Sequence, residues 1–459
     1  MTDLEGIANR MLEQQFSEKE ITELLEKLYS IFKPGLDEEI ISKLSQSIIK
    51  EVFNSRASPT DDIVSDVLNY SPVQLTAGEQ GVGSRGTGDF VVHSYLTKMA
   101  SNHSGAFLAP DSMDDAGAVT MTNNGESIYI VSKMEGMHSR LSNFPFIAGF
   151  HVTRACLRDV LVKGAKPVSI MVDIHLGDDS DIAKLFDFMA GVSCVAELAG
   201  VPITAGSTLR IGGDMVIGTR ITGGIAAVGT CNRVLARRDI LPDADIIMTE
   251  GAGGGTIATT AIYHSWPDVI LYTLNVKFIK AMSVLLDQKE ILEKIYCCSD
   301  VTNGGLRGDL FEILHSAGIG ADVYETSVAG LVESHVKEML DTAKTDYLGV
   351  SLDALLVFCE PGATEEVLAL LRENSINAAK IGTCFQGEKI LFHESNGETR
   401  ELVPHFRESA YTLVKKIIGE KVDPLVQARM NGLVKAAFQS ASEKKVRISS
   451  WISTHNQLE

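Results

Sequence analysis

Three aspartate-containing segments have the residue types that bind metal ions or phosphate groups. In the first, residues 111–119, Asp111, Asp114 and Asp115 precede small residues that let the backbone approach a ligand. Three carboxylates within five positions repel one another unless a cation lies among them. A solvated acidic turn explains the same residues without a ligand, and this segment taken alone favours that simpler interpretation.

The second segment, residues 157–167, reads as the end of an amphipathic helix. Gly164 closes the helix and Pro167 prevents its continuation. Asp159 lies within this apolar helical stretch, where a carboxylate is costly to bury without a partner. We therefore expect either a metal ion or an ion pair, for which Arg154 or Arg158 offers a purely structural partner.

The third segment, residues 298–309, places Asp300 at the end of a strand, before a glycine turn and an apolar helix. Such a turn directs backbone N–H groups toward an anion. A plain connection between strand and helix explains the glycines. It does not explain why Asp300, Thr302 and Asn303 occur together. The functional and the structural interpretation are therefore equally supported for this segment.

A fourth group, Lys133, Glu135 and His138, follows another strand. An ammonium, a carboxylate and an imidazole suit phosphate binding, metal binding and proton transfer respectively. The two-residue period of a strand places Lys133 and Glu135 on one face. A single histidine is more often structural than catalytic, which makes His138 the weaker candidate.

Three glycine-rich stretches lie near these groups. Residues 78–88 contain Gly83, Gly86 and Gly88, and this density of glycine predicts a mobile loop or lid in place of a fixed helix. Residues 205–206 and 251–255 follow strand-like runs, but neither matches the dinucleotide fingerprint or the lysine-bearing phosphate loop. A nucleotide site in this chain therefore needs another design.

The elements that position these groups alternate between strand and helix patterns, which predicts an α/β fold. Residues 1–70 show helical spacing, with a capping box at Ser17 and Glu20, and predict an accessory helical extension. A first α/β domain is expected over residues 71–237. A second is expected over residues 238–420, starting near Leu241-Pro242, and a helical tail over residues 421–459.

Composition narrows the class of protein. A net charge of −19 repels nucleic acid, and no basic patch offsets it. Seven cysteines without metal-ligand spacing indicate reduced thiols. The first fifteen residues contain acids and no apolar signal region, and no run of eighteen apolar residues occurs, so we expect a cytoplasmic protein without a membrane partner.

Taken in order, four segments resemble the aminoimidazole ribonucleotide (AIR) synthetase-like superfamily. That superfamily includes formylglycinamidine ribonucleotide synthetase, thiamine monophosphate kinase, selenophosphate synthetase and a hydrogenase maturation dehydratase. Residues 114–119 are similar to its Asp-Asp-Ala-Ala-Val segment and residues 158–167 to its Asn-Asp-Leu…Gly-Ala-x-Pro. Residues 200–206 resemble Gly-Val-Pro-Ile-x-Gly-Gly, and residues 300–306 resemble Asp-Val-Ser-Asp-Gly-Gly-Leu.

The resemblance implies Mg²⁺ and ATP as cofactors. Carried over by position, Asp115, Asp159 and Asp300 are the implied magnesium ligands. The implied nucleotide-binding residues are Gly83, Gly86, Gly88, Asp114, Thr302, Asn303 and Gly304, and the implied catalytic residues are Lys133, Glu135 and His138.

The same resemblance implies a reaction and an architecture. ATP phosphorylates an amide or carbonyl oxygen of a small metabolite, which is then ligated or cyclised. The implied fold has an N-terminal α/β domain that builds a shared barrel across a homodimer, followed by a second α/β domain. Two alternatives stay open: a kinase, because residues 135–138 are similar to the Glu-Gly-Val-His of thiamine monophosphate kinase, and a non-catalytic ATP-binding maturation protein or scaffold.

Overall fold

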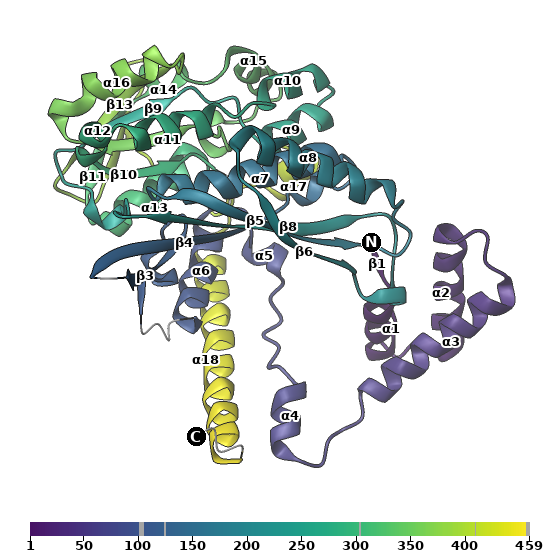
Figure 1. The fold of residues 1–459 in the computed structure, drawn as a ribbon. Helices are drawn as coiled ribbons and strands as arrows, with labels where there is room; N and C mark the ends of the chain where they lie inside the picture. Colours follow the sequence, from purple (N-terminus) through teal and green to yellow (C-terminus); the bar gives the residue numbers. More distant parts are fainter. Residues whose placement is uncertain (101–104, 124, 303, 409, 456–459) are drawn as a thin grey trace.

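Two mixed β-sheets form the centre of the molecule (Figure 1). The computed structural model describes residues 1–100, 105–123, 125–302, 304–408 and 410–455. The first sheet has the strand order β2-β3-β4-β8-β5-β6, and only β5 and β6 run parallel. Its strands are β2 (Ala106–Leu108), β3 (Gly117–Asn123), β4 (Glu126–Gly136), β5 (Lys166–Leu176), β6 (Ile203–Arg210) and β8 (Ile221–Cys231).

Helices α7 (Pro145–Val162) and α8 (Ala183–Ala199) cover one face of this sheet. Alternate residues of β5, including Ile170 and Val172, are buried beneath them. Almost all of α7 is buried because the second sheet packs on its opposite side, where Leu355 and Val357 join the same hydrophobic core. The two lobes therefore share one core through α7, which fixes their relative position.

The second sheet has the order β10-β12-β9-β13-β11-β14-β15. Helices lie on both of its faces: α11 (Lys277–Asp287) and α16 (Thr364–Glu373) on the side of α7, α13 (Gly305–Ala317) and α15 (Ser334–Thr342) on the other. Strands β9 and β12 are consequently buried along their whole length. The strands are β9 (Asp245–Thr249), β10 (Ile295–Asp300), β11 (Gly320–Tyr324), β12 (Leu355–Cys359), β13 (Ala378–Phe385), β14 (Ile390–His393) and β15 (Thr399–Glu401).

One stretch of the described chain, Pro267–Asp287, is long and apolar enough to cross a membrane, with a mean hydropathy of 1.6. The structure divides it into a short 3₁₀ turn, α10 (Ile270–Thr273) and α11. Phe278, Met282 and Leu285 of α11 are buried in the core that α7 shares with both sheets. The α11 part of this stretch therefore packs in the core of the fold.

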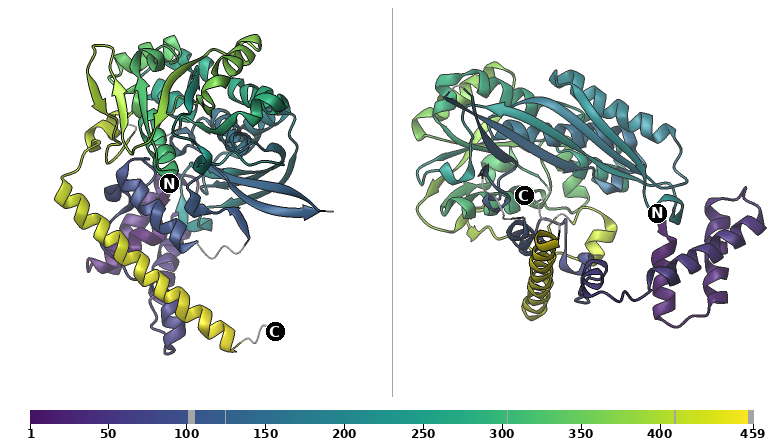
Figure 2. Two further views of the ribbon diagram at one scale, coloured as in Figure 1. Left: turned by 90° about the vertical axis from the view of Figure 1, so that its left-hand side faces the viewer. Right: turned by 60° about the horizontal axis from the view of Figure 1, so that its bottom comes forward.

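The first three helices form a bundle beside the main body (Figures 1 and 2). They are α1 (Leu4–Glu13), α2 (Glu18–Phe32) and α3 (Glu38–Ser55), and they enclose a small core of their own. The predicted capping box at Ser17 and Glu20 is present. Strand β1 (Thr2–Asp3) pairs with β7 (Val216–Ile217), which anchors the bundle to the first lobe.

The carboxyl-terminal helix α18 (Pro424–His455) projects from the body and packs on α6 (Thr87–Met99) and α4 (Asp62–Leu68) (Figure 2). Gln427 Nε2 lies 3.1 Å from Thr87 Oγ1, and Arg447 Nε lies 2.7 Å from Asp66. Segments from both ends of the chain therefore support one another.

The glycine-rich residues 78–88 form a turn at residues 81–86, as predicted, and helices reach into both ends of the segment: part of α5 (Ala77–Gln80) and the first two residues of α6. A side chain at Gly86 would meet the backbone oxygens of His405 and Phe406, each 2.6 Å from the Cβ position. A Cβ added at Gly88 would likewise lie only 2.7 Å from atoms of the Phe406 ring. Contact with residues 405–406 thus overrides the low helix propensity of glycine.

Candidate active site

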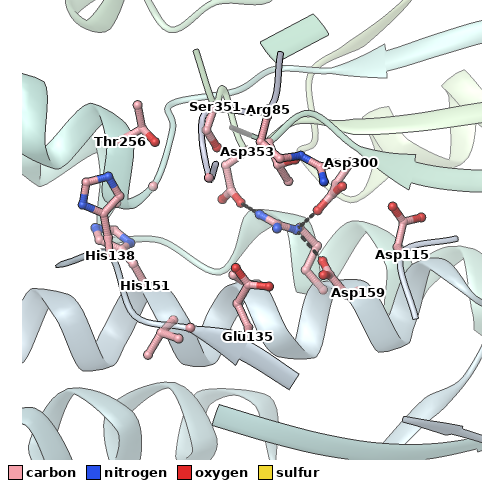
Figure 3. A pocket seen from close by; sticks show the side chains of 18 of the residues that line it. Arg85, Asp115, Glu135, His138, His151, Asp159, Thr256, Asp300, Ser351 and Asp353 are labelled. Carbon is pink, nitrogen blue, oxygen red and sulfur yellow. Dashed lines mark hydrogen bonds and ion pairs between the residues drawn. The ribbon is translucent and has the colours of Figure 1, made fainter. Parts of the chain in front are cut away.

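A cavity of about 770 Å³ lies where the two lobes meet. It brings together residues predicted from distant parts of the sequence: Gly83, Asp114, Asp115, Lys133, Glu135, His138, Asp159, Asp300 and Thr302 all line it. Gly86, Gly88 and Gly304 are not among its lining residues. Asn303 lies outside the described residues. Figure 3 shows the carboxylates at one end of the cavity and two histidines at the other.

The acidic turn at Asp114 and Asp115 is neutralised by the protein itself. Lys163 Nζ, which is fully buried, lies 2.7 Å from Asp114 and 2.9 Å from Asp115. Arg237 contributes a second cation at 2.5 Å from Asp115. Burial opposes ionisation of Asp115, yet Arg237 and Lys163 together hold its pKa well below its usual range. Asp111 is exposed and does not line the cavity.

Lys133 and Glu135 point into the cavity from β4, as the strand period predicts. Lys133 Nζ lies 2.7 Å from Asp159 and 3.4 Å from Glu135. Asp159, on the last turn of α7, also contacts Arg158 Nε at 3.2 Å. The ion pair that the sequence left open as an alternative at Asp159 is therefore present, with Arg158 and Lys133 as its partners.

Asp300 ends β10 and pairs with Arg158. Burial raises the pKa of Asp300 well above its ordinary value, and the charge of Arg158 opposes that rise. Arg158 also contacts Asp353 at 2.5 Å. Asp353 comes from the loop before β12 and has a φ of 54°, a left-handed conformation that is uncommon for a residue other than glycine.

The opposite end of the cavity is built around His138. Its Nε2 lies 2.7 Å from the Tyr411 hydroxyl and its Nδ1 lies 3.2 Å from Thr259 Oγ1. Burial lowers the pKa of His138 to about 4, so the ring is neutral at neutral pH. Lys415, whose Nζ lies 4.3 Å from the Tyr411 ring centre, also lines this end, and burial lowers its pKa to about 8. An amine with such a pKa exchanges its proton near neutral pH.

The amino terminus of α9 (Gly255–Tyr263) opens onto the same end of the cavity. Its first backbone N–H groups have no partner within the helix. His151 is 5% exposed, and its Nδ1 has no hydrogen-bond partner and lies 3.9 Å from the Cβ position at Gly254. Arg154 reaches within 3.1 Å of the same position. A helix terminus and a guanidinium together suit an anionic group.

The glycine-rich segment contributes a third wall. Asp89, which is fully buried, accepts hydrogen bonds from the backbone N–H of Gly83 at 2.8 Å and of Arg85 at 3.0 Å. This fixes the turn that carries Arg85, whose guanidinium pairs with Glu312 of α13. Arg85 therefore lies in the cavity as a positioned cation.

Sequence reasoning missed several residues of the cavity. Arg85 lies in a segment in which the glycines alone form a pattern, and His151 has no motif around it. Arg154 was predicted only as a structural partner of Asp159. Arg237, Asp353, Tyr411 and Lys415 belong to segments with no motif around them. The signal at Asp353, its unusual φ, exists only in the structure.

Replacing His138 by Gln is expected to flatten the dependence of stability on pH between about pH 4 and 6.5. The pKa of this group falls from 6.5 to about 4 on folding, so in this window the unfolded chain binds a proton that the folded chain does not. Stability therefore rises with pH there, by roughly 1.4 kcal/mol per pH unit at most from this group. Thermal midpoints at pH 5 and pH 7 measure the difference. His151, whose pKa is also lowered by burial, leaves part of the slope in place, and an unchanged slope in His138→Gln contradicts the prediction.

Two sequence models of one family match this chain in succession. The N-terminal domain model of the AIR synthase related protein family matches residues 113–231, and its C-terminal domain model matches residues 242–393. An uncharacterized protein of Methanocaldococcus jannaschii is 41% identical over 450 residues, which is 97% of each chain. Phosphoribosylformylglycinamidine synthase subunit PurL of Metallosphaera sedula is 23% identical over 67% of this chain. The present chain spans 43% of that PurL subunit.

Solved structures share the fold at low sequence identity. Hydrogenase maturation protein HypE in complex with ATP has a TM-score of 0.52 at 18% identity, covering 70% of this chain and 96% of HypE. Thermotoga maritima PurL with ADP has a TM-score of 0.52 at 17% identity, covering 79% and 55%. ThiL with AMPPCP and TMP has a TM-score of 0.52 at 13% identity, covering 70% and 96%. With both domain models matched in order and a relative 41% identical along its whole length, the chain belongs to the AIR synthase related protein family.

Proposed function

We propose that this protein is a magnesium-dependent, ATP-using enzyme that phosphorylates an amide or carbonyl oxygen of a small metabolite, which is then ligated or cyclised. The observation that carries the proposal is the single cavity between the lobes, with buried aspartates at one end and a second polar site at the other. Two ends of different chemistry suit two reactants, a nucleotide and an acceptor.

The nucleotide is assigned to the aspartate end. Structures that share this fold were solved with ATP, ADP or AMPPCP, which supports a nucleotide ligand here. Arg85, Lys133 and Arg237 line this end and supply cations for phosphate oxygens. The turn at Gly83, fixed by Asp89, brings backbone close to the same space.

The residues present fit Mg²⁺ by donor type. Asp115, Asp159 and Asp300 offer carboxylate oxygens, which this ion prefers, and all three line the same cavity, where Arg158 is the ion-pair partner of Asp300 Oδ2. Bound there, Mg²⁺ would neutralise charge that builds up on the phosphates during transfer. Asp114 remains paired with Lys163, whose Nζ lies 2.7 Å away, and this pair orients the turn that carries Asp115.

The acceptor is assigned to the end that contains His138. An anionic group of the acceptor fits the amino terminus of α9, next to His151 and Arg154. The acceptor oxygen attacks the γ-phosphorus of ATP and ADP departs. A nucleophile then displaces the new phosphate ester as inorganic phosphate. His138, held by Tyr411, and Lys415 are placed to accept and return protons in these steps.

One alternative is a small-molecule kinase. It is supported by residues 135–138, Glu-Gly-Met-His, and by the shared fold of ThiL, which was solved with AMPPCP and TMP. A kinase leaves its acceptor phosphorylated, whereas a ligase or cyclase releases inorganic phosphate. A scaffold that binds ATP without turnover is a third possibility, favoured by the added helices at both ends.

The first experiment is a thermal-shift titration with ATP, with and without Mg²⁺. It is followed by product analysis against pooled metabolites: ADP with inorganic phosphate supports a ligase or cyclase, and a phosphorylated acceptor supports the kinase. Stabilisation without turnover supports the scaffold. No shift with either nucleotide form contradicts the nucleotide site altogether.

We also propose that the protein is a cytoplasmic homodimer joined through the open face of the first sheet. The strand registers place Met134, Ala226, Met171 and Ala205 in one row on the face opposite α7. Met134, at the β4 end of that row, is 65% exposed, although it is a large apolar side chain. An apolar row on an uncovered sheet face suits a second copy of the same face.

Met134→Glu is expected to convert the dimer to a monomer, because a charge buried at a two-fold interface meets its own copy. Molar mass from light scattering measures the change. Leu271→Glu is the matched control, since Leu271 is 71% exposed on α10, away from the sheet. A monomeric wild type, or equal dissociation of both variants, contradicts this interface.

A further inference from the structure

Arg158 occupies the centre of the carboxylate group at which the metal is proposed. It projects from α7, is 5% exposed, and contacts three aspartates from three different elements. Asp159 lies 3.2 Å away, Asp353 lies 2.5 Å away, and Asp300 is its third partner (Figure 3). Several carboxylates that converge on one point are the arrangement expected around a metal ion, and here the convergent charge is a guanidinium.

Cations of the protein already face the carboxylates of this group without a metal. Arg158 faces the three aspartates, Lys133 adds a cation at 2.7 Å from Asp159, and Arg154 adds one at 2.6 Å from Asp353. Lys133 is shared with Glu135, which lies 3.4 Å from it. A divalent ion placed between Asp159 and Asp300 would meet the Arg158 guanidinium as a like charge at close range, in surroundings with little water to screen it.

The loop conformation at Asp353 favours this arrangement. Its left-handed φ of 54° is costly for an aspartate, and it persists because the surroundings hold it. The backbone N–H of Asp353 donates to Val301 O at 2.9 Å, one residue beyond Asp300. Asp353 is therefore tied to the end of β10 and remains a partner for Arg158 if the guanidinium leaves Asp300.

We propose that Arg158 competes with the divalent ion for Asp159 and Asp300, and that it yields this place only when nucleotide phosphates offer it other partners. This inference rests on the proposed metal and nucleotide site. In the motif that residues 158–167 resemble, the position of Arg158 is Asn, which carries no charge to compete. Metal binding in this chain is accordingly coupled to nucleotide binding, and the free ion binds weakly.

The test measures Mn²⁺ binding to the nucleotide-free protein by electron paramagnetic resonance. Arg158→Gln removes the competing charge and is expected to bind Mn²⁺ about tenfold more tightly or better. Arg158→Lys keeps the charge and is the matched control, expected to bind Mn²⁺ as weakly as wild type. Arg158→Gln should also have a lower thermal midpoint without metal and recover with Mn²⁺, because its three aspartates then lack a central cation.

Equal Mn²⁺ affinity in wild type and Arg158→Gln overturns the inference, as does tight Mn²⁺ binding to nucleotide-free wild type, a measurement that needs no variant. Mg²⁺-dependent stabilisation by ATP in wild type, together with either result, overturns this inference alone and leaves the proposed function standing. Loss of the ATP response in every form of the protein removes the proposed function and this inference with it.

Discussion

Asp300→Asn is expected to abolish the Mg²⁺-dependent stabilisation of the protein by ATP. The substitution preserves shape and removes a carboxylate oxygen from a proposed ligand that is buried in the cavity and paired with Arg158. Losing a carboxylate from a magnesium site should weaken binding of the Mg²⁺–ATP complex by about 100-fold. A thermal-shift titration with ATP, run with Mg²⁺ and with EDTA, measures the loss.

Asp245→Asn is the matched control. Asp245 is 4% exposed, against 3% for Asp300, and it starts β9 in the same sheet. Its partners are Lys380 and Thr364, outside the cavity. This variant should lose some stability and keep the full ATP response. If both variants respond to Mg²⁺ and ATP as wild type does, Asp300 is not a metal ligand.

Much of the aspartate end could be predicted from sequence, because its residues follow short patterns. Asp115, Asp159 and Asp300 each lie beside small residues or at an element boundary, and all three line the cavity between the lobes. Their role as metal ligands stays a prediction. The resemblance to the family implied that these three aspartates bind magnesium together. What local patterns could not supply was the cations: Lys163 and Arg237 meet Asp115 only because α7 and the segment before β9 converge on it.

The His138 end could not be predicted for a related physical reason. Tyr411 reaches His138 across 273 positions of sequence, in a segment with no motif. The loop predicted over residues 78–88 is present at residues 81–86, and helices extend into both ends of the segment. In the folded protein Gly86 and Gly88 are small enough to let residues 405–406 pack against the start of α6, and this contact stabilises the helix. Both outcomes depend on the same segment, residues 403–412.

That segment is held by a buried ion pair, which leads to the second large effect. Glu408 has no exposed side-chain surface and accepts two hydrogen bonds from Arg307 of α13, from Nε at 2.9 Å and from Nη2 at 2.6 Å. Glu408→Gln leaves the buried Arg307 charge opposite a neutral amide, with Asp346, 2.7 Å from its Nη1, as a remaining charged partner. Removing one partner of such a pair costs about 3 kcal/mol or more. With the entropy of unfolding expected for a chain of 459 residues, we expect the thermal midpoint to fall by roughly 3 °C or more.

Three comparisons separate this effect from a general loss of charge. Glu366→Gln removes an exposed partner of Lys294 and should leave the midpoint unchanged, because surface pairs contribute little. The double variant Arg307→Leu with Glu408→Leu removes both charges and should recover much of the loss, since no unpaired charge stays buried.

Because residues 403–412 also carry Tyr411, Glu408→Gln should raise the pKa of His138 toward 6.5 as its burial loosens, a change that histidine NMR titration detects. A stable Glu408→Gln protein with His138 still neutral at pH 6 would show that packing by Phe406 alone is sufficient to hold this wall of the cavity.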